Sequence, residues 1–201
     1  MADLSALGEL RPIEHLDLDI YKDATEGPTI PKKGLYTVQA RDSFPAEAFG
    51  RSQAGALSVT VDPKIVDGPA KGYTLRFTKV SAKIFKRDNI KVSQLGDYLR
   101  ACGIRGTYRD EQAQADAVDL TANRIFQVEV DWKAYNKNTK YSVEGMERFP
   151  SDGNGGHLPW IVDPNDFEVD DTGNVVTDAQ GNKVGKRLRA NAYVRRYVAA
   201  Q

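Results

Sequence analysis

In the segment Ile125–Trp132 (IFQVEVDW), apolar and polar side chains alternate without a break from Phe126 onward. A period of two is typical of a β-strand with one face in a core and the other in water. Such a strand needs neighbouring strands for its backbone hydrogen bonds and an apolar layer over its buried face. The sequence therefore predicts a mainly β (α+β) fold around this strand, with four side chains in the core: Phe126, Val128, Val130 and Trp132.

Three other segments indicate strands that could join it. Leu35–Ala40 and Ala56–Val61 alternate in the same way. Lys140–Met146 follows a polar turn at Asn136–Thr139 and is expected to return as the partner strand of a hairpin. Pro45–Phe49 is long enough for one helical turn between the first two strands.

Tyr73–Phe85 (YTLRFTKVSAKIF) is predicted to be one long extended segment, entered through a turn at Asp67–Gly72. Tyr73 and Phe77 lie on its apolar side and are expected in the core. The apolar phase changes near Lys79, which suggests a bulge or the end of the strand.

Two helices are predicted between the third and fourth strands. Ser93 is a suitable N-cap for a helix through Cys102, and Gly103 is a suitable residue to end it. This helix carries one apolar stripe, formed by Leu95, Tyr98, Leu99 and Cys102. A second helix is expected after Asp110, with three side chains inward: Ala113, Ala117 and Leu120.

The chain is predicted to have three parts. Residues 1–33 are irregular because prolines interrupt them, and residues 34–150 hold the strands and helices described above. Residues 151–201 form an acidic loop, Asp163–Asp171, and a basic C-terminal extension. Within that extension Arg187–Ala200 alternates and favours a strand over a short helix.

The sequence offers little enzymatic chemistry. It contains neither phosphate-binding glycine motif, and one cysteine with two histidines excludes an internal disulfide and makes a zinc enzyme improbable. We therefore expect no catalysis and no cofactor. Asp17, Asp19 or the acidic run at 163–171 could hold a hard cation, so a metal-dependent nuclease is a weaker alternative.

Charge is unevenly distributed along the chain, although its formal sum is zero. Residues 71–140 carry 14 basic and 8 acidic side chains, residues 141–180 carry 1 and 9, and residues 181–201 carry 6 and none. A polyanion responds to charge within about 8 Å at physiological salt, so two basic blocks could form one basic face. Charged side chains on any solvated surface give the same pattern, so charge alone does not decide.

Aromatic side chains lie among the basic ones, in the combination that holds single-stranded nucleic acid: rings stack on bases while cations neutralise phosphates. Tyr135 and Tyr141 flank a polar hairpin and are expected to expose their rings, whereas Trp132 fits a core position better than a binding one. The hairpin lysines could instead only protect a sheet edge. The candidate nucleic-acid-binding residues are Arg76, Lys79, Lys83, Phe85, Lys86, Arg87, Trp132, Lys133, Tyr135, Lys137, Lys140 and Tyr141.

Four segments of residues 34–150 carry a resemblance to a known family. They are the turn Asp67–Gly72 before an extended segment, the helix Ser93–Cys102, Asp119–Leu120 before the strand Phe126–Val130, and the hairpin through Asn136–Tyr141 that closes near Gly145–Pro150. In this order they resemble the phage-encoded single-stranded DNA-binding proteins built on an OB-fold. Two features depart from many such proteins: the chain ends basic, and its acidic run is internal.

The resemblance implies an OB-like five-stranded barrel with a helical insertion and an extended C-terminal segment. It also implies sequence-independent binding of single-stranded DNA in phage replication, recombination or repair, with replication or recombination proteins as further partners. The acidic run would then compete for the basic groove or bind a partner. A β-barrel protein-interaction or virion structural module is the alternative function.

No membrane span or signal peptide is evident, and we expect a reducing cytoplasm, that of the host if the protein is phage-encoded. Exposed strand edges would permit a homo-oligomer.

Overall fold

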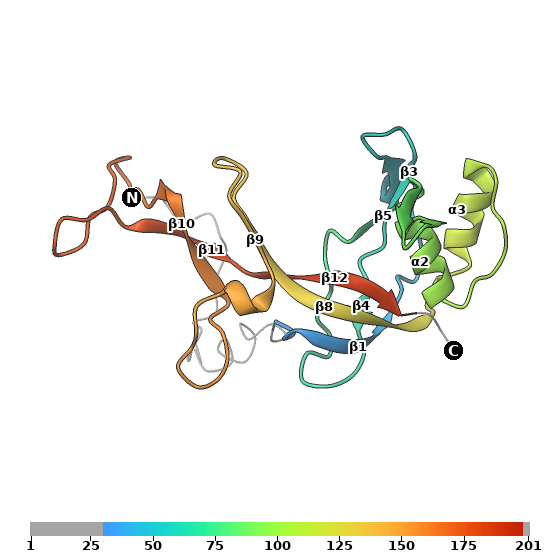
Figure 1. The fold of residues 1–201 in the computed structure, drawn as a ribbon, viewed down its shortest axis with the longest axis horizontal. Coiled ribbons are helices and arrows are strands. Elements are labelled where there is room, and N and C mark those ends of the chain that lie inside the picture. Colours follow the sequence, from blue (N-terminus) through green and yellow to red (C-terminus); the bar gives the residue numbers. More distant parts are fainter. Residues whose placement is uncertain (1–29, 199–201) are drawn as a thin grey trace, which may run out of the picture.

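A five-stranded antiparallel sheet organises the protein in the computed structural model, which describes residues 30–198. Its central strand is β8 (Ile125–Tyr135), paired on one side with β12 (Asn191–Val198). On the other side β8 pairs with β1 (Gly34–Gln39) through its first half and with β9 (Ser142–Glu144) through its end. The short strand β4 (Lys64–Ile65) extends the sheet beyond β1. Figure 1 shows the sheet curled into a half-barrel.

The alternation predicted for β8 is confirmed from Phe126 to Val130, whereas Asp131, predicted on the solvated face, is buried. Phe126, Val128 and Val130 are buried on one face, and β1 pairs in a register that sets Val38 opposite Phe126. The strand is longer than predicted and runs on to Tyr135. The mainly β architecture that this segment predicted is therefore present in the structure, with β8 at the centre of the main sheet.

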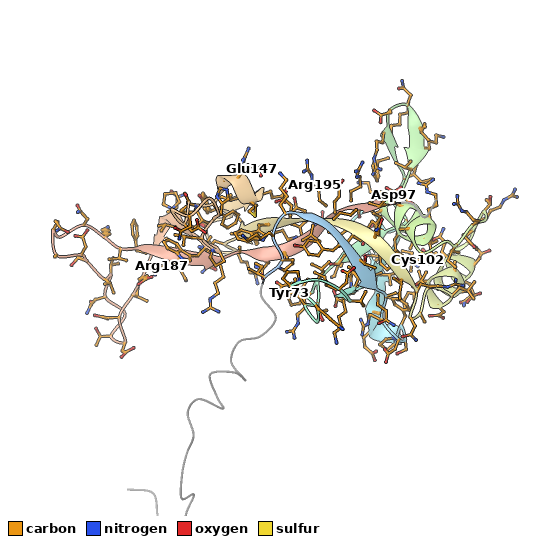
Figure 2. The ribbon with its side chains drawn as sticks, turned by 90° about the horizontal axis from the view of Figure 1, so that it is seen from below. Tyr73, Asp97, Cys102, Glu147, Arg187 and Arg195 are labelled. Atoms are coloured by element: carbon orange, nitrogen blue, oxygen red, sulfur yellow. The ribbon has the colours of Figure 1, made fainter. Side chains whose placement is uncertain are left out.

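A smaller sheet covers one end of this half-barrel. It contains β2 (Phe49–Arg51), β3 (Leu57–Thr60) and β5 (Lys79–Ser81), with the predicted helical turn η1 (Ala46–Ala48) before it. Val59 and Val80 are fully or almost fully buried in the shared core. A separate hairpin, β6 (Phe85–Arg87) and β7 (Ile90–Val92), follows and projects from the body in Figure 2.

Two helices close the same end of the molecule (Figure 1). In α2 (Gln94–Ala101) the Ser93 hydroxyl accepts a hydrogen bond from the Gly96 N–H, which is the predicted N-cap. The ring of Tyr98 meets Phe126 edge-on at 5.6 Å, so α2 fills the hollow of the sheet. The second helix, α3 (Glu111–Asp119), follows Asp110 as predicted, and the Asp110 carboxylate caps it by accepting from the Ala113 N–H. Leu120, however, is exposed rather than inward.

The long extended segment predicted for Tyr73–Phe85 is wrong. The chain turns at Phe77, whose φ of +60° interrupts any strand, and Phe77 is 83 % exposed instead of buried. The Asp62 carboxylate accepts a hydrogen bond from the Thr78 N–H, and the Thr78 hydroxyl donates to the Leu75 carbonyl. These bonds hold the turn, so the strand begins only at Lys79.

The C-terminal part is not a simple extension. After η2 (Met146–Arg148), β10 (Trp160–Phe167) and β11 (Gly185–Arg189) form a hairpin arm, and the chain then returns as β12 of the main sheet. The predicted boundary between residues 150 and 151 would therefore separate β12 from its partner strand β8. The helices also lie between β7 and β8 rather than between a third and a fourth strand.

Within residues 30–198 no helix is long and apolar enough to cross a membrane. The irregular segment predicted at the N-terminus, with His15, Asp17 and Asp19, lies almost entirely outside the described residues.

Candidate nucleic-acid interface

An open groove of about 540 Å³ lies beside the end of β12, an edge strand of the main sheet. One wall comes from the end of β12, and the opposite wall comes from the start of β5 and from β6, with α2 between them. The groove is lined by Thr78, Lys79, Phe85, Arg87, Gln94, Asp97, Glu129, Val194, Arg195, Arg196 and Tyr197. It thus unites candidate residues from 79–87 with a basic segment more than a hundred positions away.

A β-bulge in β12 decides which side chains reach this groove. The register shifts between Val194, opposite Val130, and Arg196, opposite Glu129. Regular alternation would have turned Arg196 inward, but the extra residue leaves both Arg195 and Arg196 exposed. The same shift places the Tyr197 ring beside Tyr98, with 5.6 Å between the ring centroids.

Carboxylates hold the arginines of the groove in place. Arg87 and Arg100 share Asp97, with N–O distances of 2.8 and 2.6 Å. Arg196 forms an ion pair with Glu129, and Arg195 lies 3.8 Å from a carboxylate oxygen of Asp131.

Cations remain in excess in the groove. Four cations line the groove, Lys79, Arg87, Arg195 and Arg196, whereas the lining that the structure describes contains only two carboxylates, Asp97 and Glu129. Among the described residues Lys79 has no ion pair, although it lines the groove. The groove therefore suits an anionic ligand, which would compete with the two carboxylates for the exposed guanidinium groups.

Phe85 gives the groove an accessible aromatic side chain. It is 38 % exposed, and the Arg87 guanidinium lies 5.4 Å from its ring centroid. Phe85 also lines a second hollow of about 370 Å³ together with Lys83. Lys86 lies between Phe85 and Arg87 in the strand, opposite Lys91, and is therefore on the other face of the β6–β7 hairpin.

The β8–β9 hairpin is a separate projection, which rises from the middle of the sheet in Figure 1. Its end exposes Lys137 and Lys140 and leaves Tyr135 55 % exposed. Lys133 lies 5.2 Å from the ring centroid of Tyr193, its neighbour on β12. Tyr141 differs from expectation, because it is half-buried against a second apolar cluster that includes Val143 and Phe149.

The end of this hairpin is supported by the predicted acidic segment. The carboxylate of Asp163 is fully buried and accepts hydrogen bonds from Asn136 Nδ2 at 2.8 Å and Thr139 Oγ1 at 2.5 Å. Burial raises the pKa of Asp163, but the hydrogen bonds from Thr139, the Asn165 N–H and Asn136 outweigh it, so the pKa lies below its ordinary value. The acidic residue predicted for a loop is therefore a structural part of β10.

Two candidate residues lie apart from these surfaces. Trp132 is only 3 % exposed, and its indole N–H donates to the Pro31 carbonyl at 2.6 Å, so its ring has no free face for a base. The core interpretation of Trp132 is therefore correct, and the prediction that it binds nucleic acid is wrong. Arg76 lies beside Phe77 in a different hollow, of about 580 Å³.

Sequence reasoning missed the contribution of Arg195 and Arg196 to the site. Their segment carries basic and aromatic side chains and lies in a stretch without carboxylates, from 181 to 201. That signal was available, but only the pairing of β12 with β8 shows that it adjoins residues 79–87.

Within residues 30–198 no group of three or more His, Cys, Asp or Glu side chains is arranged to hold a metal ion. His157 is half-buried, and its Nδ1 lies 2.7 Å from the Phe149 carbonyl oxygen.

Comparison with known proteins identifies one family whose model matches about two thirds of the chain. No curated protein and no solved structure shows a significant match. A family described as a protein of unknown function, DUF669, matches residues 22–155. This range contains the strands from β1 to β9, both helices and one wall of the groove, but not β12. The chain belongs to the DUF669 family.

Proposed function

We propose that the protein binds single-stranded DNA without sequence preference and without catalysis. The observation that carries this proposal is the groove beside the end of β12, where Lys79, Phe85, Arg87, Arg195 and Arg196 adjoin one another. Cations that neutralise phosphates and an accessible ring that stacks on a base are the two components of sequence-tolerant single-strand binding. The groove is open, so a polynucleotide longer than the groove can enter it and extend beyond it.

The fold supports the same proposal. We infer that the curled sheet, with α2 packed into its hollow, is an OB-like barrel that is partly open. Small barrels of this type bind oligonucleotides on a sheet face and its adjoining loops. The hairpin end at 135–141 would then be a second contact, with Tyr135 stacking and with Lys133, Lys137 and Lys140 near phosphates. Binding of this kind would serve replication, recombination or repair.

The test is fluorescence anisotropy of a labelled oligothymidine of about 30 nucleotides at two salt concentrations, with duplex DNA as competitor. We expect tight binding that weakens with salt and resists the duplex. The Lys79→Ala/Arg195→Ala variant removes two groove cations. It should lower the slope of log affinity against log salt by about 1.4, at roughly 0.7 for each phosphate that the variant no longer neutralises.

A matched control removes two exposed cations that do not line the groove, Lys71→Ala and Arg109→Ala. This variant should keep the wild-type slope. No binding by the wild-type protein at low salt would overturn the proposal and favour a protein-interaction module. Equal losses in the two variants would show a general charge effect rather than a groove.

A further inference from the structure

The β10–β11 arm has two faces of different character. In its antiparallel register Trp160 lies opposite Arg189 and Val162 opposite Arg187, so these four side chains share one face. Ile161 lies opposite Leu188 and Asp163 opposite Lys186 on the other face. We refer to the face of Trp160, Val162, Arg187 and Arg189 as the free face of the arm.

The opposite face is the one that attaches the arm to the body. Ile161 and Leu188 pack against the apolar cluster that contains Trp132 and Phe149. Asp163 is buried against Asn136 and Thr139 of the β8–β9 hairpin. Because these contacts with the body all come from the opposite face, the free face takes no part in attaching the arm within the described part of the chain.

The free face combines aromatic and cationic groups. The Arg187 guanidinium lies over the Trp160 ring, 4.5 Å from its centroid. Arg187 and Arg189 are exposed, and Val162 is 40 % exposed. Among the carboxylates of residues 30–198, none forms an ion pair with either arginine. Unlike Arg87 and Arg196 in the groove, these two cations have no carboxylate to displace.

The free face continues into the groove along a single line of side chains. Only Ala190 separates β11 from β12. Ala190 and Ala192 are buried and Leu188 is half-buried, so these alternate residues lie on the inner side. Alternate residues therefore point outward from one strand to the next: Arg187, Arg189, Asn191, Tyr193 and Arg195. At about 3.3 Å per residue, the line from Arg187 to Arg195 spans roughly 25 Å. Figure 2 shows Arg187 on the arm and Arg195 over the body.

We propose that the free face of the arm is a further contact for the same single-stranded DNA, which passes from the groove along β12 to Trp160, Arg187 and Arg189. This inference rests on the proposed function and adds to it a longer binding site with a defined far end. A polynucleotide is the occupant because the face carries a half-buried tryptophan ring and two guanidinium groups without a carboxylate partner among residues 30–198, and a line of outward-facing side chains joins it to the cations of the groove.

The experiment compares two oligothymidines, one of about 4 and one of about 30 nucleotides, because the short one cannot fill the groove and also span the roughly 25 Å to Arg187. For the long oligonucleotide, Arg187→Ala/Arg189→Ala should lower the salt slope by about 1.4. For the short one, affinity and slope should stay within error of the wild type. Lys71→Ala/Arg109→Ala is again the control, and circular dichroism and thermal unfolding check the fold of each variant.

A second readout uses intrinsic fluorescence, because the chain has only two tryptophans, Trp132 and Trp160. Trp132 is buried, so quenching by the long oligonucleotide should come from Trp160 and disappear in Trp160→Phe, which keeps an aromatic ring for stacking. The short oligonucleotide should quench less.

The two proposals fail in different ways. If the wild-type protein binds neither oligonucleotide, the proposed function fails. If it binds both, but Arg187→Ala/Arg189→Ala leaves the long one unaffected or weakens both equally, the arm is not a distal DNA contact. An acidic peptide that quenches Trp160 while the long oligonucleotide does not would make the free face a protein-binding surface instead.

Discussion

Arg196 of β12 forms an ion pair with Glu129, its direct partner on β8. This pair follows the bulge that leaves both Arg195 and Arg196 exposed. Glu129 also lines the groove, so it both orients Arg196 and competes with any anion that enters.

Replacing Glu129 by Gln should therefore strengthen single-stranded DNA binding. Exposed ion pairs contribute about 0.2–1 kcal/mol, so we expect affinity to rise by roughly 1.4- to fivefold when the pair is removed. Glu111→Gln is the matched control, because Glu111 pairs with Arg51 outside the groove at 2.7 Å. Anisotropy titrations would decide, and weaker binding by Glu129→Gln would mean that the pair positions Arg196 rather than restrains it.

Tyr135→Ala should weaken binding by about 1–3 kcal/mol if its ring stacks on a base. The ring is 55 % exposed, so the free energy of unfolding should change little. Tyr135→Phe retains the ring and should bind like the wild type. Tyr141 is unsuitable for this test because it packs against the second apolar cluster and its removal would destabilise the hairpin. Unchanged affinity in Tyr135→Ala would remove the hairpin end from the binding surface.

Asp163 should make the protein sensitive to acid. Its pKa in the folded state lies below its ordinary value of about 3.9, so the stability that the carboxylate provides is complete above that value and is lost as pH falls below it. Asp163→Asn should unfold more easily at neutral pH and lose less stability between about pH 5 and pH 2. Urea unfolding across this range tests the prediction, with Asp116→Asn, an exposed carboxylate on α3, as control. Parallel pH profiles for the wild type and Asp163→Asn would contradict it.

Cys102 should be unreactive in the folded protein. Burial raises the pKa of its thiol to about 12, and only 4 % of the residue is exposed. A thiol reacts as its thiolate, so maleimide at about pH 8 should label the unfolded chain but not the native one. Rapid labelling without denaturant would show that α2 opens away from the sheet.

Local patterns in the sequence predict much of the core. The strand at Ile125–Trp132, the N-cap Ser93 and the helix after Asp110 rely on neighbours in the chain, and the structure confirms all three. The turn at Phe77 could not be predicted in this way. A left-handed φ at a phenylalanine is stabilised here by Asp62, which binds the N–H of Thr78, 16 positions later in the chain, and by the Thr78 hydroxyl, which donates to the Leu75 carbonyl.

The candidate site shows the same division. Lys79, Phe85 and Arg87 are predicted from residue type and do line the groove. Arg196 would point inward if β12 alternated regularly, and its outward position depends on a bulge that lets Tyr197 pack beside Tyr98. That packing joins residues far apart in the sequence, so no local pattern could predict it.

The place of β8 at the centre of the sheet affects how the protein folds. Both of its long partners are distant in sequence: Leu35 pairs with Glu129, and Val198 pairs with Gln127. Because non-local strand pairing must close large loops before the strands can meet, we expect slow folding, in milliseconds to seconds, rather than the microseconds of a helical bundle. Until β12 arrives, the apolar strand β8 has an open edge that another chain could occupy, so newly made protein should aggregate most readily at that stage.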